Sequence, residues 1–221
     1  MKKYIPTFLI GLAIVFVIGF IVRALLAPED TSTGSNTEIS QEDQTALKSG
    51  ASIGNPNSTV VVTEFGDYQC PACAQWHAYI KDTLLPKYQD KTLFVFKNFP
   101  LPIHKNAKAS AYAVEAAGLQ GKFWEMHNIV YESQQEWENE SDPNAKFEEY
   151  AKRVGLNIDQ WKKDKDSGKI KDLVEKDTKL AEKLNLPGTP SFLVNGVLID
   201  TKSEEALIQA IDQALAQPPA Q

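Results

Sequence analysis

The chain has 221 residues, 43% of them hydrophobic, which is enough to bury one sizeable core and suits a single domain. The formal net charge is -6 at pH 7, and the lysines and arginines are interleaved with acids, so we expect no basic surface for nucleic acid. The two cysteines stand three positions apart, and all sulfur chemistry is therefore expected at one site.

The N-terminus carries a membrane signal. An apolar run of roughly 20 residues, the length that spans a bilayer, follows Lys2 and Lys3. The best signal-peptidase site ends at Ala27, but Pro28 directly after it would hinder cleavage. We therefore predict that residues 1–27 form an uncleaved transmembrane anchor rather than a removed signal segment. The two lysines favour a cytoplasmic N-terminus, which leaves the rest of the chain outside the cytoplasm.

The next segments are predicted from composition and periodicity. Residues 28–51 contain almost no apolar side chains, so we expect a flexible tether, followed by a folded domain over residues 52–217. Runs of β-branched and aromatic residues at 59–65 and 92–99 are typical of strands buried on both faces. Between them, apolar residues at spacings of three and four predict a helix over residues 71–88.

The second half of the chain completes the fold prediction. Residues 104–184 have a helical pattern and are expected to form several packed helices. Apolar runs at 191–194 and 197–199, joined by Asn195-Gly196, then predict a β-hairpin before a final amphipathic helix. The order strand, helix, strand, helical insert, hairpin and helix predicts an α/β, thioredoxin-like fold with an inserted helical domain.

The two cysteines lie where the first strand ends and the helix begins. Pro71 suits the first helical position, which places Cys70 at the helix N-terminus. Free backbone N–H groups and the helix dipole stabilise a thiolate there, so we expect Cys70 to have a lowered pKa and to act as an exposed nucleophile. Cys73 lies on the buried side of the helix, where its pKa should be raised. Helical residues three apart lie within disulfide range, so the pair can open and close.

Two other interpretations of the cysteine pair stay open. A structural disulfide would close a loop of four residues and stabilise the fold by only about 2 kcal/mol. A zinc site would need further ligands, and His77, His104 and His127 follow no recognised ligand spacing. We therefore predict no metal and no cofactor other than a redox-active disulfide between Cys70 and Cys73.

Four segments resemble the DsbA-like thiol oxidoreductases, and the likeness covers residues 54–215. The segments are Val62-Thr63-Glu64-Phe65-Gly66-Asp67-Tyr68-Gln69-Cys70-Pro71-Ala72-Cys73, Asn98-Phe99-Pro100, Phe123-Trp124-Glu125-Met126 and Gly188-Thr189-Pro190-Ser191-Phe192. The resemblance implies that Cys70 attacks, that Cys73 resolves, and that Pro190 is a cis-proline beside the disulfide.

The resemblance also implies where substrate binds. Pro71, Ala72 and Thr189 would contact it, because a proline that offers no N–H leaves neighbouring backbone groups free to pair with an extended peptide. The best-known members of the family have His where this chain has Ala72. A comparably strong oxidising potential therefore does not follow from the resemblance.

Glu64 is a further candidate, because it stands in an otherwise apolar strand six residues before Cys70. A buried carboxylate is costly unless it is paired or protonated. Lys97 is placed similarly in the second strand, so we predict a Glu64–Lys97 ion pair beneath Cys73. Relatives carry an acid at the matching position that assists proton transfer, and the resemblance implies the same role here. The alternative is a solvated carboxylate at a strand end.

Other conspicuous residues are assigned structural roles. His77 lies about 10 Å along the helix from Cys70 and is expected to be a surface or packing residue. Trp124, Tyr131 and Trp137 are expected to pack the helical insert. The charged run over residues 162–183 is expected to be a solvated helix face.

Together these features predict an enzyme that exchanges the Cys70–Cys73 disulfide with cysteines of exported polypeptides, as a dithiol oxidase. Reoxidation by a membrane quinone-linked partner is implied by the resemblance only. The expected location is the periplasm or the outer face of the cell membrane, and a monomer is expected. A reductase or isomerase of the same fold is the alternative enzyme, and an extracytoplasmic binding or chaperone module with a structural disulfide is the non-catalytic alternative.

Overall fold

The protein is described by a computed structural model that covers residues 39–200 and 203–217. No helix within these ranges is long and apolar enough to cross a membrane. The predicted anchor over residues 1–27 lies outside them.

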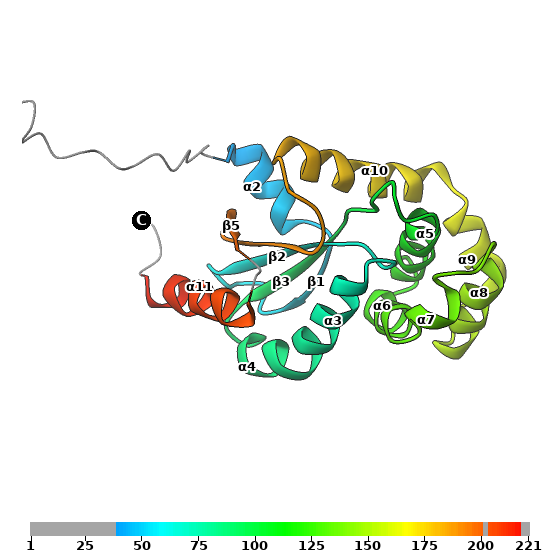
Figure 1. Ribbon diagram of the computed structural model, residues 1–221, viewed down its shortest axis with the longest axis horizontal. Coiled ribbons are helices and arrows are strands. Elements are labelled where there is room, and N and C mark those ends of the chain that lie inside the picture. The colour runs from blue at the N-terminus through cyan, green and yellow to red at the C-terminus, as the bar shows by residue number, and fades with distance from the viewer. Residues whose placement is uncertain (1–38, 201–202, 218–221) are drawn as a thin grey trace, which may run out of the picture. The chain divides into compact units, whose positions relative to one another are not determined.

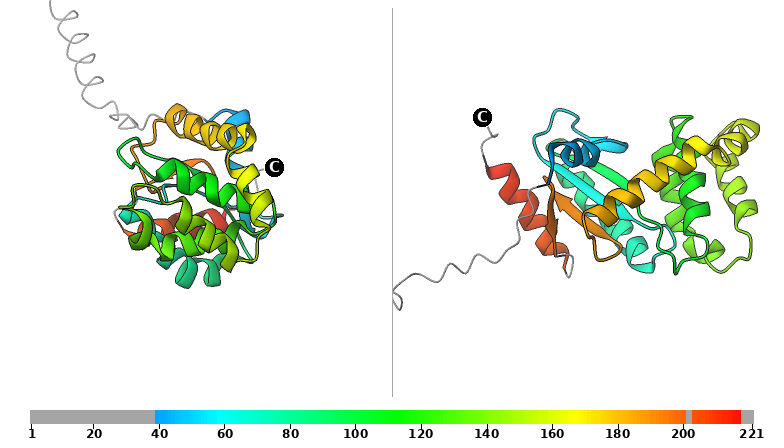
Figure 2. Two further views of the ribbon diagram at one scale, coloured as in Figure 1. Left: turned by 90° about the vertical axis from the view of Figure 1, so that its right-hand side faces the viewer. Right: turned by 90° about the horizontal axis from the view of Figure 1, so that it is seen from above.

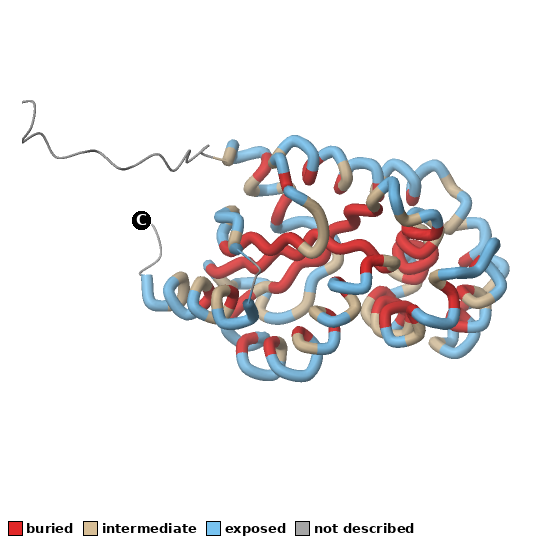
Figure 3. The backbone as a smooth tube through the Cα atoms, viewed as in Figure 1, coloured by how far each residue is buried: buried red, intermediate tan, exposed pale blue. Residues whose placement is uncertain are grey.

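A five-stranded sheet of order β1-β3-β2-β4-β5 forms the centre of the domain (Figure 1). Its strands are β1 (Ala51–Gly54), β2 (Val61–Gly66), β3 (Leu93–Asn98), β4 (Ser191–Val194) and β5 (Val197–Ile199). The two long strands, β2 and β3, pair in parallel, and every other pairing is antiparallel. All residues of β2 are buried, in keeping with a largely apolar sequence that only Thr63 and Glu64 interrupt (Figure 3).

The helical stretch after β2 has the predicted length but changes its winding midway. It comprises α3 (Pro71–Tyr79), a π-helical turn (Ile80–Leu84) and α4 (Leu85–Tyr88). The N–H of Leu85 donates to the carbonyl of Ile80, five residues earlier. Pro86 has no N–H with which to continue the ordinary ladder, so the wider turn directly before it accommodates the proline.

Two further helices cover opposite faces of the sheet (Figure 1). The last helix, α11 (Glu204–Ala216), buries Leu207 and Ile211 in the same apolar cluster as Phe192 of β4 and the α3–α4 stretch. Helix α10 (Gly168–Lys183) packs on the other face, where it contacts β3.

Part of the predicted tether over residues 28–51 is wrong, because Gln41–Lys48 form helix α2. Ser40 caps this helix by accepting a hydrogen bond from the N–H of Asp43 at 3.1 Å. Its only deeply buried apolar side chain is Leu47, which packs against the sheet in the same cluster as Phe65 and Leu193. A single buried leucine and an N-cap residue are too weak a pattern to predict a helix from composition. The packing of Leu47 against the sheet stabilises this helix.

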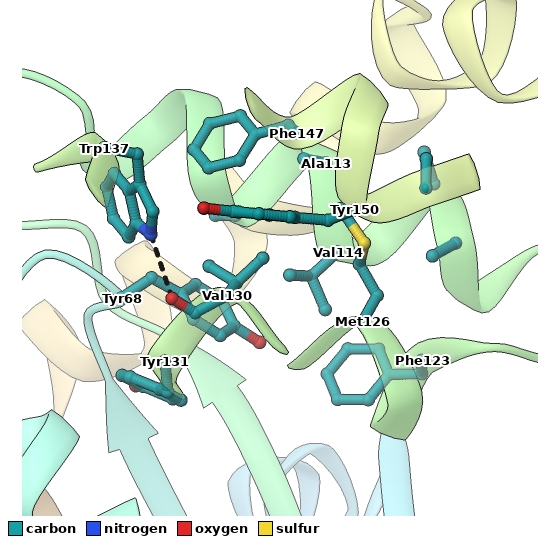
Figure 4. Packing of buried hydrophobic residues seen from close by; sticks show 14 of the residues in the cluster. Tyr68, Ala113, Val114, Phe123, Met126, Val130, Tyr131, Trp137, Phe147 and Tyr150 are labelled. Atoms are coloured by element: carbon teal, nitrogen blue, oxygen red, sulfur yellow. Dashed lines mark hydrogen bonds between the residues drawn. The ribbon is translucent and has the colours of Figure 1, made fainter. Parts of the chain in front are cut away.

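The helical insert between β3 and β4 is confirmed. Its helices are α5 (Ala107–Gly118), α6 (Phe123–Glu132), α7 (Gln134–Trp137), α8 (Asn144–Arg153), α9 (Ile158–Lys165) and α10. Aromatic side chains fill its core, and Trp137 donates from Nε1 to the carbonyl of Val130 at 2.9 Å (Figure 4). Trp137 and Tyr131 are buried as predicted. Helix α10 runs from the insert back to the sheet and so links the two (Figure 2).

Candidate active site

The two cysteines lie at the junction that the sequence predicts. Cys70 is the N-cap of α3, and Pro71 follows at the start of the helix. The N–H of Cys70 donates to the carbonyl of Asp67 at 3.0 Å, which closes the turn between β2 and α3. Both cysteines are free thiols in the structure.

The surroundings of Cys70 favour its thiolate. The pKa of Cys70 is lowered to about 5, first by a hydrogen bond from the Cys73 thiol and then by backbone N–H groups of Cys73 and Ala72, with burial opposing the shift. The expected acidity is thus confirmed, but its largest cause is the second thiol rather than the helix end. The prediction of an exposed sulfur is wrong, because Cys70 is only 7% exposed. Its thiol lies 3.4 Å from the carbonyl oxygen of Thr189, which covers it.

Cys73 has the opposite character. It is fully buried, and its Sγ accepts a hydrogen bond from the N–H of Asp67 at 3.5 Å. Burial is the main cause that raises the pKa of Cys73 well above its ordinary value, and the neighbouring Cys70 and Glu64 raise it further. Two thiols three residues apart therefore differ strongly in acidity, as the helix geometry predicted.

The predicted substrate-contacting residues surround Cys70. The Thr189-Pro190 peptide bond is cis, as predicted, and its carbonyl oxygen is the one that faces the Cys70 sulfur. Thr189 and Pro190 are half-buried, whereas Pro71 and Ala72 are exposed. These two segments therefore flank Cys70, one along the start of α3 and one beside its sulfur.

The predicted Glu64–Lys97 ion pair is wrong. In the parallel pairing of β2 with β3, Glu64 stands opposite Phe96, and Lys97 stands opposite Phe65. Neighbouring residues of a strand point to opposite faces, so Glu64 and Lys97 lie on different sides of the sheet. Lys97 instead pairs with Asp177 of α10, with Nζ 3.0 Å from Oδ1.

Asp177 also corrects the expectation of a fully solvated charged run over residues 162–183. Its carboxylate is buried and accepts hydrogen bonds from the backbone N–H of Asn98 at 3.1 Å and from the Asn98 side chain at 3.3 Å. The same amide donates to Glu115 of α5 at 2.6 Å. Burial raises the pKa of Glu115 to about 7. This network joins the end of β3 to the insert.

Glu64 is buried on the face that α3 covers. It is 2% exposed, which is at odds with the alternative of a solvated carboxylate, and burial raises its pKa to about 8. Its Oε1 has no hydrogen-bond partner within the part of the chain that the structure describes. The carboxyl is therefore largely protonated at neutral pH, and it lies close enough to Cys73 to influence that thiol.

A cavity of about 130 Å³ lies next to Glu64. It is bounded by β1, β2, β3, the α3–α4 stretch and α6, and the residues that line it are Ile53, Glu64, His77, Ile80, Lys81, Leu85, Phe94, Trp124, His127 and Asn128. His77 is buried, so of the two roles expected for it, packing is the correct one. His127 is also buried, and its Nδ1 lies 2.9 Å from the Tyr68 hydroxyl.

Asp67 is a site residue that the sequence analysis did not single out. Its buried carboxylate accepts hydrogen bonds from the N–H groups of Gln69 at 2.8 Å and Leu101 at 2.9 Å, and it lies 2.7 Å from Nδ1 of His104. Its own N–H contacts Cys73. The sequence feature that could have identified it is an aspartate three residues before Cys70, in a turn, where a carboxylate commonly accepts hydrogen bonds from the backbone.

The histidines, cysteines and acids of the described residues do not gather into a metal site. Within residues 39–200 and 203–217, no group of three or more His, Cys, Asp or Glu side chains is arranged to hold a metal ion. His104 is engaged with Asp67, and His77 and His127 lie in the aromatic packing of α3 and α6.

Comparison with known proteins identifies the family. The profile of the family described as Thioredoxin matches residues 46–213. The chain is also 34% identical over 213 residues to the "Probable disulfide bond formation protein D" of Bacillus anthracis, covering 93% of each chain. The chain belongs to the DsbA-like thioredoxin family. This confirms the predicted membership and enzyme class, that of a thiol–disulfide oxidoreductase.

Solved structures of DsbA-like and thioredoxin-like proteins support the same fold. BdbD from Bacillus subtilis, in its oxidised form, is 26% identical with a TM-score of 0.68, and the match covers 75% of this chain and 92% of BdbD. A thioredoxin-like oxidoreductase from Silicibacter pomeroyi is also 26% identical, with a TM-score of 0.67, covering 81% of this chain and 100% of that one.

Proposed function

We propose that this protein is a dithiol oxidase that transfers a Cys70–Cys73 disulfide to cysteine pairs of exported polypeptides. The observation that carries the proposal is the contrast between the two thiols: the pKa of Cys70 is about 5, and that of Cys73 is raised well above its ordinary value. An acidic thiol is a good leaving group, and a buried one is protected from competing attack.

The proposed reaction has two exchange steps. A substrate thiolate attacks Cys70 Sγ, forms a mixed disulfide and displaces Cys73 as a thiolate. A second substrate thiolate then attacks the substrate sulfur of the mixed disulfide and displaces Cys70, whose low pKa makes it the better leaving group. The substrate loses two electrons, and the enzyme ends as the dithiol.

Glu64 is proposed to handle the proton of Cys73. Its pKa of about 8 keeps the carboxyl protonated at neutral pH, so it can give a proton to the Cys73 thiolate as that sulfur is displaced. In the reverse direction the carboxylate accepts the proton of Cys73. No metal or second cofactor is part of this proposal.

The surface around Cys70 is proposed to bind substrate as an extended segment. Pro190 offers no N–H, and the adjacent Thr189 presents backbone groups to a peptide lying beside the sulfur. Pro71 and Ala72 form the exposed wall on the other side. Backbone pairing of this kind suits many sequences, as an oxidase of varied polypeptides requires.

The cellular setting is also a proposal. The name of the Bacillus anthracis relative, a disulfide bond formation protein, supports action outside the cytoplasm, where disulfides persist. The apolar N-terminal run supports a membrane anchor, and a membrane quinone-linked partner is the proposed reoxidant. We propose that the protein acts as a monomer.

The test uses a reduced, unfolded protein with two cysteines as substrate. The oxidised enzyme should form the disulfide of this substrate stoichiometrically. Cys73→Ala, mixed instead with the disulfide form of the same protein, should accumulate a mixed disulfide on Cys70 as one substrate sulfur leaves as a thiolate. Cys70→Ala, the matched control, should accumulate none. An enzyme that instead reduces substrate disulfides at a cytosol-like glutathione ratio would be a reductase, and a Cys70–Cys73 bond that resists reduction would indicate a binding module.

A further inference from the structure

Asn98 Oδ1, Tyr131 Oη and Thr189 Oγ1 are buried polar atoms that have no hydrogen-bond partner among the described residues, and two more such atoms belong to residues that line one cavity near the dithiol. These two are Oε1 of Glu64 on β2 and Nε2 of His77 on α3. Both residues line the 130 Å³ cavity, and His77 is only 5% exposed. Buried polar atoms are nearly always hydrogen-bonded to protein or to ordered water, so this pair calls for an explanation.

Water in the cavity would explain both unpartnered atoms. A single water needs roughly 10–15 Å³ of such space, so about 130 Å³ is ample for several. Besides Glu64 and His77, the otherwise mostly apolar lining includes Lys81 and Asn128, whose polar groups can also bond water. Lys81 is partly exposed and pairs with Glu132 at 2.6 Å, which marks the solvent side of the cavity.

We propose that water in this cavity joins Oε1 of Glu64 to Nε2 of His77, and that His77 is a positioning residue that sets the acidity of Glu64. This inference rests on the proposed function, in which Glu64 exchanges a proton with Cys73. Without the water that His77 holds, the Glu64 carboxylate loses its solvation and its access to bulk protons.

The groups around His77 are consistent with a neutral imidazole. Burial lowers the pKa of His77 to about 4, and the charges nearest to it are Lys81 and Asp82 on its own helical stretch and Glu132 on α6. The rings of His127 and Tyr131 pack against it at centroid distances of 5.1 Å and 5.0 Å. A neutral imidazole can accept from water or donate to it without adding a charge beside Glu64.

Within the part of the chain that the structure describes, the titratable groups that sense Glu64 offer it no opposite charge. Cys73, Tyr68 and Tyr131 are the titratable side chains that sense its charge. The pKa values of all three are raised, mainly by burial, so they stay neutral and none provides a cation. Hydration from the cavity is therefore the source of stabilisation for a Glu64 carboxylate.

The step to measure is resolution of the mixed disulfide that the reduced enzyme forms with glutathione disulfide. In this step the Cys73 thiol gives its proton to the Glu64 carboxylate, the thiolate attacks Cys70 Sγ, a Cys70–Cys73 bond forms, and glutathione leaves as a thiolate. The rate should rise with pH through the pKa of Glu64. Stopped-flow measurement over a pH series gives the midpoint.

His77→Leu removes the polar atom, and the midpoint should move upward by about one pH unit, the size expected for one lost hydrogen bond to a charged group. His77→Gln retains a polar group and should restore most of the shift. Glu64→Gln should abolish the pH dependence, and adding His77→Leu to it should change nothing further. Ile80→Val, which alters the cavity wall without a polar atom, should leave the midpoint in place.

The outcomes separate the two proposals. An unmoved midpoint in His77→Leu, with the Glu64→Gln effect intact, overturns the role of His77 and leaves the proposed function standing. A normal profile in Glu64→Gln overturns both the proton role of Glu64 and this inference. Failure of the wild-type enzyme to resolve the mixed disulfide refutes the proposed function itself. If His77→Leu does not fold, His77→Phe keeps a ring against Tyr131 and provides the same test.

Discussion

The relative stability of the dithiol and disulfide forms should reverse with pH. The low pKa of Cys70 means that folding stabilises its thiolate in the dithiol form, and the disulfide form has no thiolate there. A depressed pKa contributes stability that is complete above the unfolded value of 9.0 and is lost as pH falls through the folded value of about 5. Neutral pH lies about midway between these two pKa values, so about half of the full stabilisation is present there.

The magnitudes decide which form is more stable. At about pH 7, two pKa units above the folded value, the thiolate stabilises the dithiol form by roughly 3 kcal/mol. The disulfide stabilises the other form by constraining a loop of four residues, worth about 2 kcal/mol. The dithiol form should therefore be more stable by roughly 1 kcal/mol at neutral pH, and the two forms should become equal near about pH 6.5.

Denaturant unfolding of both redox forms, followed by tryptophan fluorescence across this pH range, measures the difference. Glu64 and Glu115, whose pKa values are raised to about 8 and about 7, also titrate here, but they are present in both forms and their effects cancel in the difference to first order. Cys70→Ala, which has neither thiolate nor cross-link, should show only that shared background. A stability difference that is constant, or that favours the dithiol form more in acid, would refute the reasoning.

Three further predictions follow from packing and sequence. Lys97→Met should destabilise the domain by about 3 kcal/mol by leaving the Asp177 carboxylate buried and unpaired, and adding Asp177→Leu should recover most of that loss in denaturant unfolding. Gly66→Ala should lower stability by about 1–3 kcal/mol, since its Cβ would lie 2.5 Å from the Phe96 ring and 2.9 Å from the Tyr131 hydroxyl; an unchanged melting temperature would contradict this. The full chain should stay in the membrane fraction after an alkaline wash, and a soluble form starting at the predicted cleavage site would count against the anchor.

Much of the fold could be predicted because its signals are local. Asn195-Gly196 between apolar runs predicts the β4–β5 hairpin from turn chemistry alone, and both strands are present. Pro71 between a strand and a helix predicts the helix start and so the contrast between the two thiols. These features depend on neighbouring residues, which a single sequence displays directly.

Errors arose where the outcome depends on contacts between distant segments. The pairing offset between β2 and β3 decides which face Lys97 points to, and no spacing within either strand encodes it. His77 is different, because its signal was present: it follows Cys73 by four residues and precedes Ile80 by three, which puts it on the buried seam. The sequence analysis left both a surface and a packing role open for His77, although this periodicity assigns the position to the interior.

The sheet separates two sets of buried polar groups with different roles. One is an ion pair that stabilises the fold, and the other is a carboxyl group that must exchange a proton. On the α10 side, Lys97 and Asp177 are buried as an ion pair, which fixes the insert against the sheet. On the α3 side, no cation among residues 39–200 and 203–217 pairs with Glu64, and its pKa of about 8 lets it gain or lose a proton in the range where thiols exchange. Had the predicted Glu64–Lys97 pair formed, the lysine would have held the carboxylate ionised, and no proton would have been available for Cys73 at neutral pH. Because Glu64 pairs with Phe96 and not with Lys97, the side chains of Glu64 and Lys97 point to opposite faces of the sheet. The stabilising ion pair is thereby kept away from the carboxyl group that is proposed to transfer a proton.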